Sequence, residues 1–494
     1  GAVQLIASLP YVDTARIGVT GHSSGGTAAN MAVEIDNSRE TPLIAAVLQQ
    51  AGDWQDDTGG DHSGDYGSRS VGIIASTHDD FYFGTYDDAG NMLTNPAAFM
   101  ETDGAKKFLN FNEDGFAGIA EGGKYYTRDF DGKTAYRVIY RPNMIHPLVA
   151  FSTTCVGYAV DFFDTTLGAP KPLPASDQIW PIKAVFNSLG VIGLLIFMVS
   201  FTLVLLDTPV FSALRSGEIV QPAPVQDSGA KAWYWVLLII GAVFSGSSFL
   251  FCMNTVYSKT TNFFVQTGPL TIGTWAALCG VFAIFCSAVF YGAYGKKHGW
   301  SARRAGLYLN LEQLWKTIAL AVIVIVVSFG LVFAAHYFFQ VDYRMYVVAF
   351  KTFGADKVLI ALRYLPFFLL FYVMNSISAN CFNYNTIGGK NGNILIFAFF
   401  NALGAIFVVA SQYIYFYATG YQLYGLTEGQ RIGPIWLFPC MVLLFVTPIM
   451  SRIIYKRTRN PYIAGLINAM FIVMISCSNT TTILGGGELI ATTF

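Results

Sequence analysis

The chain has 494 residues, of which 53% are hydrophobic and only 12% are charged. Soluble globular domains carry about 25% charged residues, so this composition excludes a protein that is soluble throughout. The net charge of −1 hides an asymmetry. Residues 1–180 hold 11 Lys and Arg against 23 Asp and Glu, whereas residues 181–494 hold 19 against 8. Because the water-soluble part is acidic and repels phosphate, nucleic-acid binding is not expected.

Residues 1–169 are predicted to form an α/β domain. Runs rich in β-branched residues predict strands at 16–20, 43–49, 70–76 and 134–140. A helix is expected at 27–33 and a closing helix at 151–166. Strands that alternate with helices indicate a mostly parallel sheet. Before the last strand, residues 84–133 are interpreted as a cap-like insertion that shapes a pocket, or else as a plain surface excursion.

The first helix is preceded by Gly21-His22-Ser23-Ser24-Gly25, which matches the G-x-S-x-G nucleophile elbow. The backbone of such a turn is strained and the helix packs close to it, so glycines two residues to either side of Ser23 are expected to be required. The Ser23 hydroxyl then stands at the carboxyl end of a strand, and the Ser24 amide can donate to an oxyanion. The same five-residue pattern also occurs in ordinary Gly/Ser-rich turns, and the remaining triad residues distinguish the two interpretations.

Two downstream residues complete a triad in the order nucleophile, acid, histidine. Asp79 follows the strand predicted at 70–76, and His146 lies in the loop after the strand predicted at 134–140. Both are therefore expected at strand ends, where the functional groups of parallel sheets lie. Asp80 is the alternative to Asp79, because either could occupy this position. No metal or organic cofactor is expected for this chemistry.

The segment Val12-Asp13-Thr14-Ala15-Arg16-Ile17-Gly18-Val19-Thr20-Gly21-His22-Ser23 resembles the elbow region of α/β-hydrolases of the dienelactone hydrolase and acyl-peptidase type. Asn143-Met144-Ile145-His146-Pro147 is similar to their histidine loop. The resemblance implies that Ser23 is the nucleophile, His146 the general base and acid, and Asp79 the orienting carboxylate. It also implies the C-terminal part of an α/β-hydrolase sheet. The leading strands and the loop with the second oxyanion donor are expected to be absent.

Other polar groups in this part are interpreted as structural. An acidic, Gly-rich run lacks the spacing of a calcium loop and is expected to be solvated. Its carboxylates are Asp53, Asp56, Asp57, Asp61 and Asp65. His22 is expected to pack within the elbow or to bond the backbone, and His62 and His78 have no ligand partners at suggestive spacing. The seven cysteines include no CxxC pair, so neither a disulfide framework nor a structural zinc site is expected.

Residues 184–494 are predicted to form an all-α bundle of seven or eight transmembrane helices, because apolar runs of about 20 residues recur between short polar breaks. These runs cover 184–206, 232–253, 271–293, 317–339, 358–377, 394–417, 434–451 and 462–478. Residues 170–183 contain four prolines and are interpreted as a linker, with Trp180 as an interfacial anchor. Arg363 and His336 lie in or near apolar runs, and either a functional role or snorkelling at a helix end explains them.

Together these features predict a membrane-bound serine hydrolase that cleaves an ester or amide bond in a small molecule, a lipid or a peptide. Membrane lipid is the expected partner of the helical part. The alternative is a transporter or membrane-complex subunit with a degenerate hydrolase domain, since eight spans exceed what an anchor needs. With the hydrolase domain outside, the inside loops hold 12 Lys and Arg and the outside loops 5. This bias predicts a plasma-membrane protein whose hydrolase domain is extracytoplasmic.

Overall fold

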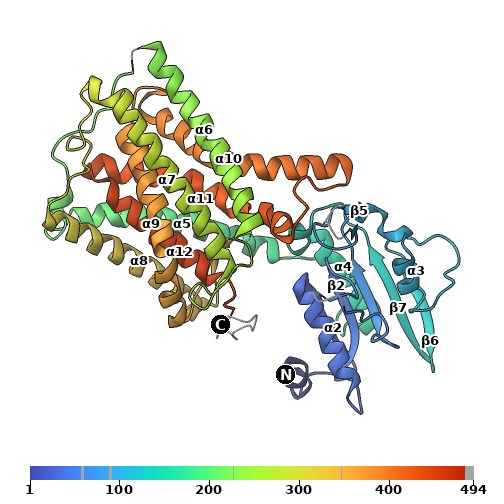
Figure 1. Cartoon of the computed structure of the whole chain (residues 1–494). Coiled ribbons are helices and arrows are strands. Elements are labelled where there is room, and N and C mark those ends of the chain that lie inside the picture. The colour runs from blue at the N-terminus through green and yellow to red at the C-terminus, as the bar shows by residue number, and fades with distance from the viewer. Residues whose placement is uncertain (57–59, 88–91, 226, 347, 484–494) are drawn as a thin grey trace. The chain divides into compact units, whose positions relative to one another are not determined.

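The computed structural model describes residues 1–483 except 57–59, 88–91, 226 and 347. The chain divides into two compact units. The first contains residues 1–181 and the separate segment 411–431, and the second contains residues 182–410 and the chain from 432 onward. In Figure 1 the main sheet is coloured blue to cyan, and the long helices of the second unit run from green to red.

The main sheet of the first unit has five strands in the order β1-β2-β3-β7-β6. Their bounds are β1 Ile17–His22, β2 Ile44–Gln50, β3 Ser70–Ile74, β6 Tyr126–Phe130 and β7 Lys133–Tyr140. The helices are α1 Ala2–Ala7, α2 Ser24–Asn37, α3 Asp103–Leu109 and α4 Thr153–Leu167, with 3₁₀ helices η1 Pro96–Glu101 and η2 His146–Phe151. Strands β4 Thr85–Tyr86 and β5 Met92–Thr94 form a separate antiparallel hairpin. All four predicted strands and both predicted helices are present.

The sheet is mostly parallel, as predicted. Strands β1, β2, β3 and β7 pair in parallel, and β6 pairs antiparallel with β7. Strand β6 and helix α3 both come from the stretch at 84–133 that was interpreted as a cap. The cap interpretation does not hold for these two elements, because β6 forms one edge of the sheet and α3 places Phe108 and Leu109 in the core.

Helices cover both faces of the sheet. Adjacent residues of a strand point to opposite faces, and Ile73 and Ile74 of β3 accordingly belong to two separate cores. The core of one face joins Ile73 to Val33 of α2, and the core of the other joins Ile74 to Phe162 of α4. Strand β3 is buried along its whole length, as is typical of a central parallel strand covered on two sides.

Eight helices among the described residues are long and apolar enough to span a membrane, which matches the upper end of the predicted range. They are α5 Trp180–Leu206, α6 Ser228–Thr255, α7 Thr267–Ala293, α8 Leu311–Phe339, α9 Ala355–Ile377, α10 Gly389–Thr419, α11 Glu428–Thr458 and α12 Pro461–Ser478. A π-helical turn, η5 Ser378–Phe382, extends α9. The remaining short elements are η3 Ser212–Leu214, η4 Gly295–His298 and the hairpin of β8 Tyr343–Met345 with β9 Val348–Phe350. By the length and composition of its helices, the chain is an integral membrane protein.

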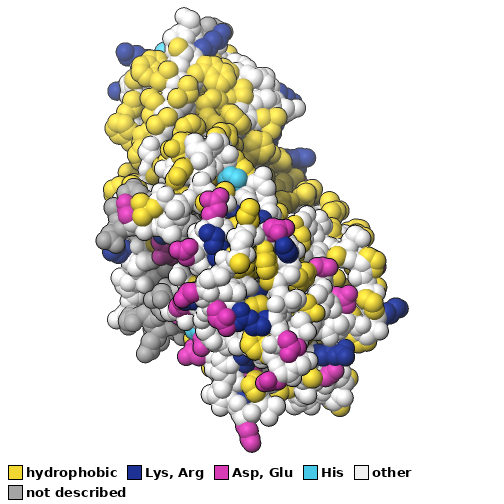
Figure 2. Space-filling model, turned by 90° about the vertical axis from the view of Figure 1, so that its right-hand side faces the viewer, with side chains coloured by type: hydrophobic (Ala, Val, Ile, Leu, Met, Phe, Trp, Pro, Cys, Tyr) yellow, Lys and Arg dark blue, Asp and Glu magenta, His cyan; other side chains and the backbone are white. Residues whose placement is uncertain are grey.

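The helical unit has a hydrophobic core and an apolar exterior. Helix α12 packs against α8 and α9, and most of its side chains are buried. Large apolar side chains such as Phe285 of α7 and Val326 of α8 remain exposed, as suits a surface solvated by lipid. Figure 2 shows this difference in chemistry, with hydrophobic side chains gathered over the helices and Asp and Glu side chains spread over the sheet-containing part.

Candidate active site

The predicted triad residues follow three strands that run in the same direction. Ser23 comes directly after β1, Asp79 follows β3, and His146 follows β7. Because β1, β2, β3 and β7 are parallel, their carboxyl ends meet at one edge of the sheet, which is where ligands of α/β sheets bind. The ladder between β3 and β7 also continues past the named strands through a bridge between His78 and Ile145. This pairing holds the loop that carries Asp79 and Asp80, the acid loop, next to the loop that carries His146, the histidine loop.

Ser23 has the strained backbone that a nucleophile elbow requires. Its φ is 57° and its ψ is −126°, a conformation rare for a residue with a Cβ. The Ser23 amide donates to the Gln50 carbonyl at 3.0 Å, and the Ser23 carbonyl accepts from the Gly26 amide at 2.7 Å. Helix α2 begins at Ser24, so the Ser24 amide lies at the positive end of the helix dipole.

The glycines of the elbow are not equivalent. A Cβ on Gly21 would collide with the carbonyl of Gly25, and one on Gly26 would collide with the side chain of Gln49. A Cβ on Gly25 would meet open space. The sequence-based expectation that glycine is required on both sides of Ser23 is therefore correct for Gly21 and wrong for Gly25, because the helix approaches the strand at Gly21 and Gly26 instead.

His146 and Asp79 form a buried pair. Nδ1 of His146 lies 2.9 Å from Oδ1 and 3.0 Å from Oδ2 of Asp79. The Asp79 carboxylate also accepts from the amides of Phe81 and Tyr82, at 3.0 and 2.9 Å, and from the Ser76 hydroxyl at 3.1 Å. With Nδ1 donating to Asp79, the Nε2 atom of a neutral His146 is the ring nitrogen that can accept a proton.

Burial and charge act against each other in this pair, and charge dominates. Burial by itself raises the pKa of Asp79, but the charge and hydrogen bond of His146 and the two amides bring that pKa below its usual range. Burial by itself lowers the pKa of His146, yet the Asp79 carboxylate raises it above the ordinary value of 6.5. An imidazolium that forms next to Asp79 is therefore stabilised.

Asp80, the alternative acid, has a different environment. Its Oδ2 accepts from the backbone amide of His146 at 3.3 Å and does not contact the imidazole. The side chain is fully buried, and this burial raises the pKa of Asp80 to about 8. At neutral pH the group is mostly a neutral acid, unsuited to stabilising an imidazolium. The geometry favours Asp79 over Asp80 as the orienting carboxylate.

His22, predicted to bond the backbone or pack, does both. Its Nε2 lies 3.2 Å from the His146 carbonyl oxygen, and the two imidazole rings are 4.9 Å apart. A carbonyl oxygen only accepts, so Nε2 of His22 is the donor. Burial and the neighbouring His146 lower the pKa of His22, which keeps its ring neutral at pH 7. His22 thereby links the nucleophile elbow to the histidine loop.

The segment 411–431 supplies contacts that sequence reasoning missed. The Gln422 amide nitrogen donates to the Asp80 carbonyl at 2.7 Å. The ring of Tyr417 lies 4.4 Å from that of His78, and the Arg431 guanidinium lies 4.6 Å above the Tyr86 ring. These contacts steady the loop that carries Asp79 and Asp80. They join positions up to 342 residues apart, so no local pattern could have indicated them.

The described residues show no direct hydrogen bond between the side chains of Ser23 and His146. Among the residues that the structure describes, the Ser23 hydroxyl makes no hydrogen bond to His146, and the contact between the two loops runs through His22. In ligand-free active sites the bond between nucleophile and base is often long and tightens when substrate binds. The arrangement can therefore support nucleophilic attack, with the Ser24 amide as an oxyanion donor.

The described carboxylates of the acidic run include two that pair with a histidine. Within the described part of the chain, no group of three or more His, Cys, Asp or Glu side chains could hold a metal ion. His62 pairs instead with Asp65 at 2.9 Å and Asp56 at 3.4 Å. Burial by itself lowers the pKa of His62, but these carboxylates raise it. Asp57 lies outside the described residues.

Comparison with known proteins returns no relative. No protein-family model, no curated protein and no solved structure matches the chain. The functional proposal therefore depends on the chemistry and geometry of the site alone.

Proposed function

We propose that this protein is a membrane-bound serine hydrolase that cleaves an ester or amide bond. The observation that carries the proposal is the buried His146–Asp79 pair at the same sheet edge as Ser23, whose backbone has a strained elbow conformation. Strained residues and perturbed pKa values both concentrate at functional sites. A purely structural role would account for the pairing of His146 with Asp79. It would not account for the strained backbone at Ser23.

In the proposed reaction the Ser23 Oγ attacks the substrate carbonyl carbon while Nε2 of His146 takes the hydroxyl proton. The carbonyl oxygen becomes an oxyanion and accepts a hydrogen bond from the Ser24 amide. Collapse of this intermediate breaks the ester or amide bond, and His146 gives its proton to the leaving alcohol or amine. Water then attacks the acyl-serine while His146 takes one of its protons. The bond between the acyl carbon and Ser23 Oγ breaks, His146 returns the proton to Oγ, and a carboxylic acid is released. Asp79 holds the imidazole in the required tautomer throughout.

The nucleophile is tested by active-site labelling. The purified full chain should react with a fluorophosphonate probe, and Ser23→Ala should abolish the labelling because it removes the attacking oxygen. Ser24→Ala is the matched control, since the amide at position 24 remains. In turnover assays, loss of a serine nucleophile typically costs up to about 10⁶-fold in rate. Labelling that persists in the Ser23→Ala variant refutes the assignment, and a folded wild-type chain that is never labelled favours the transporter or complex-subunit alternative.

A further inference from the structure

The second unit contains an elongated cavity of about 1560 Å³. Its wall includes a stripe of α7 residues spaced three or four apart, which runs from Gly268 to Ala293 and so forms one helix face. The 25 helical steps from Gly268 to Ala293 correspond to a length of about 38 Å, more than the hydrocarbon thickness of a bilayer, about 30 Å. The volume also exceeds the roughly 300–1,000 Å³ of small-molecule pockets. A long, narrow ligand suits this shape better than a compact one.

The middle of the cavity is apolar. Leu238 of α6, Phe282 of α7 and Phe371 of α9 line it. Two amide side chains of this part of the wall bond to protein groups: the Asn375 side chain donates to Asn401 at 2.6 Å, and Asn401 donates to the Leu444 carbonyl at 2.6 Å. Such a wall gives an ion or a polar solute no replacement for its hydration shell, so it favours a hydrocarbon chain.

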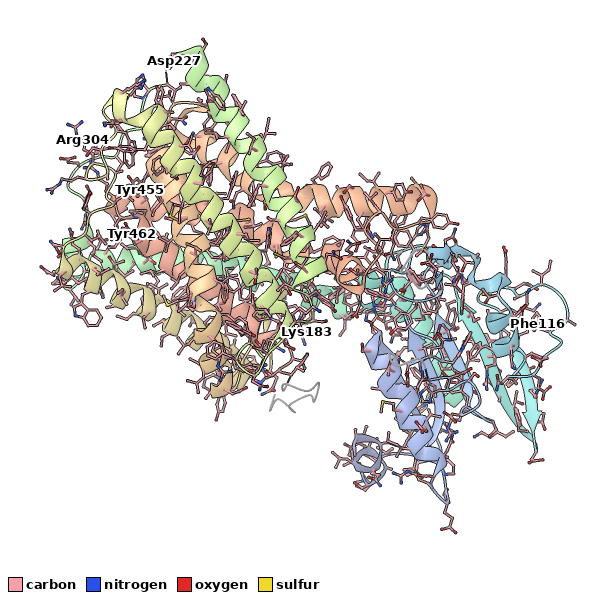
Figure 3. The ribbon with its side chains drawn as sticks, viewed as in Figure 1. Phe116, Lys183, Asp227, Arg304, Tyr455 and Tyr462 are labelled. Atoms are coloured by element: carbon pink, nitrogen blue, oxygen red, sulfur yellow. The ribbon has the colours of Figure 1, made fainter. Side chains whose placement is uncertain are left out.

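One end of the cavity, where α6 begins, is polar. Asp227, at the start of α6 in Figure 3, lines this end, but its carboxylate accepts from the Ala230 amide as a helix cap. Tyr234 lies farther along α6, and its buried hydroxyl has no hydrogen-bond partner among the described residues. Asn383 and Asn385 add amide groups to the same wall. The unpaired hydroxyl can donate a hydrogen bond to a ligand.

A buried positive charge lies directly behind this wall. The Arg452 guanidinium is 3.9 Å from the centroid of the Tyr384 ring, which lines the cavity. It donates to the side-chain oxygens of Asn380 and Asn393 and to the Ala379 carbonyl, all of them neutral. Among the described residues no carboxylate pairs with it. An uncompensated charge inside a membrane protein is costly and produces a strong positive potential nearby.

We propose that this cavity binds a long-chain anionic amphiphile, with its hydrocarbon chain along α7 and its carboxylate or phosphate monoester at Tyr234, next to Arg452. The anionic head group would accept a hydrogen bond from the Tyr234 hydroxyl and offset the charge of Arg452. The hydrocarbon chain would pack against the apolar middle of the cavity without breaking a hydrogen bond there. The site is separate from the triad and does not depend on the proposed hydrolysis.

The test uses the full chain in neutral-lipid nanodiscs and an oleate analogue with a photoreactive group in its chain. Crosslinked peptides should come from the cavity-lining faces of α6, α7 and α10. Oleate or oleyl phosphate should compete at least about 10-fold more effectively than oleyl alcohol, because only the anions form charge-assisted contacts. The stronger of the two anions identifies the head group. Equal competition by the alcohol, or crosslinks confined to outward-facing residues, overturns the proposal.

Variants separate the cavity from the lipid surface. Ala283→Trp fills the cavity and should abolish crosslinking, whereas Ala288→Trp, at an exposed position of the same helix outside the lining, should not. Tyr234→Phe and Arg452→Gln should each reduce the preference for anions over the alcohol, and Arg452→Lys should retain most of it. If Arg452→Gln does not fold, Tyr234→Phe alone decides: an unchanged anion preference contradicts the proposal. Ser23→Ala should leave all of these results unaltered.

Discussion

At the residue scale, the two adjacent carboxylates of the acid loop make a matched experiment. Asp79 contacts the imidazole of His146 with both oxygens, whereas the Asp80 carboxylate accepts from the backbone amide of His146. Replacing the orienting aspartate of a triad by asparagine lowers kcat by about 10⁴-fold, so Asp79→Asn should have an effect of that order. Asp80→Asn should cost far less, within about 10-fold, since a neutral amide resembles the neutral acid already present at pH 7. Steady-state rates of both variants measure this, and the reverse order assigns the role to Asp80.

The same pair predicts how activity depends on pH. Only neutral His146 can take the proton of Ser23, and Asp79 raises the pKa of His146 above 6.5. We expect kcat/KM to increase with pH through an apparent pKa above 6.5, which belongs to the coupled pair rather than to one residue. In Asp79→Asn the raising charge is gone, so the residual activity should titrate at lower pH. An unchanged profile in this variant would show that Asp79 does not act on His146.

At the scale of elements, the turn from β1 to α2 should tolerate alanine at position 25 but not at position 21. Gly21→Ala brings its Cβ against the Gly25 carbonyl, and overpacking of this kind costs about 1–3 kcal/mol in the free energy of unfolding. Gly25→Ala meets open space within a helix, where alanine is more favourable than glycine by up to about 1 kcal/mol. Thermal unfolding of the two variants should therefore move in opposite directions. Equal destabilisation would mean that Gly25 has a backbone role beyond helix formation.

At the scale of the whole molecule, the distribution of charge predicts which side of the membrane carries the sheet. Arg452 and Lys357, both counted above as loop residues, are buried in the bundle, which leaves 11 Lys and Arg in the inside loops against 4 outside. The cluster at 296–304 includes Arg304, whose side chain extends from its loop in Figure 3. Because Lys and Arg of short loops stay in the cytoplasm, we expect residues 1–180 to be extracytoplasmic.

Protease treatment of sealed spheroplasts measures this orientation. External protease should remove residues 1–180 and leave the loop at 294–316 intact, and cleavage of that loop should require lysis. An antibody to an internal tag in the 294–316 loop provides the control for membrane integrity. Protection of residues 1–180 in sealed spheroplasts reverses the orientation and places the hydrolase substrate in the cytoplasm.

The amino-acid sequence alone determined the elements whose signals are local. Long apolar runs predicted seven or eight membrane spans, and the described residues contain eight helices of sufficient length, because a span needs only enough apolar residues in succession. The short β-rich runs and the Gly21–Gly25 motif predicted β1, the elbow and α2 in order, because each depends on neighbouring residues. The chain order of Ser23, Asp79 and His146 indicated one sheet edge, since parallel strands bring their carboxyl ends together.

Only the tertiary structure decided the features that depend on distant partners. Pairing with β7 makes 126–130 an edge strand, although its local pattern suits a surface loop as well. One of these features is the contact of the Asp79 carboxylate with the imidazole of His146, which is 67 residues away in the chain. The contact of Gln422 with the acid loop and the burial of Arg452 among amides also arise from residues that are far apart in the chain. A pattern of neighbouring residues cannot predict such contacts, because they form only when the folded backbone brings distant residues together.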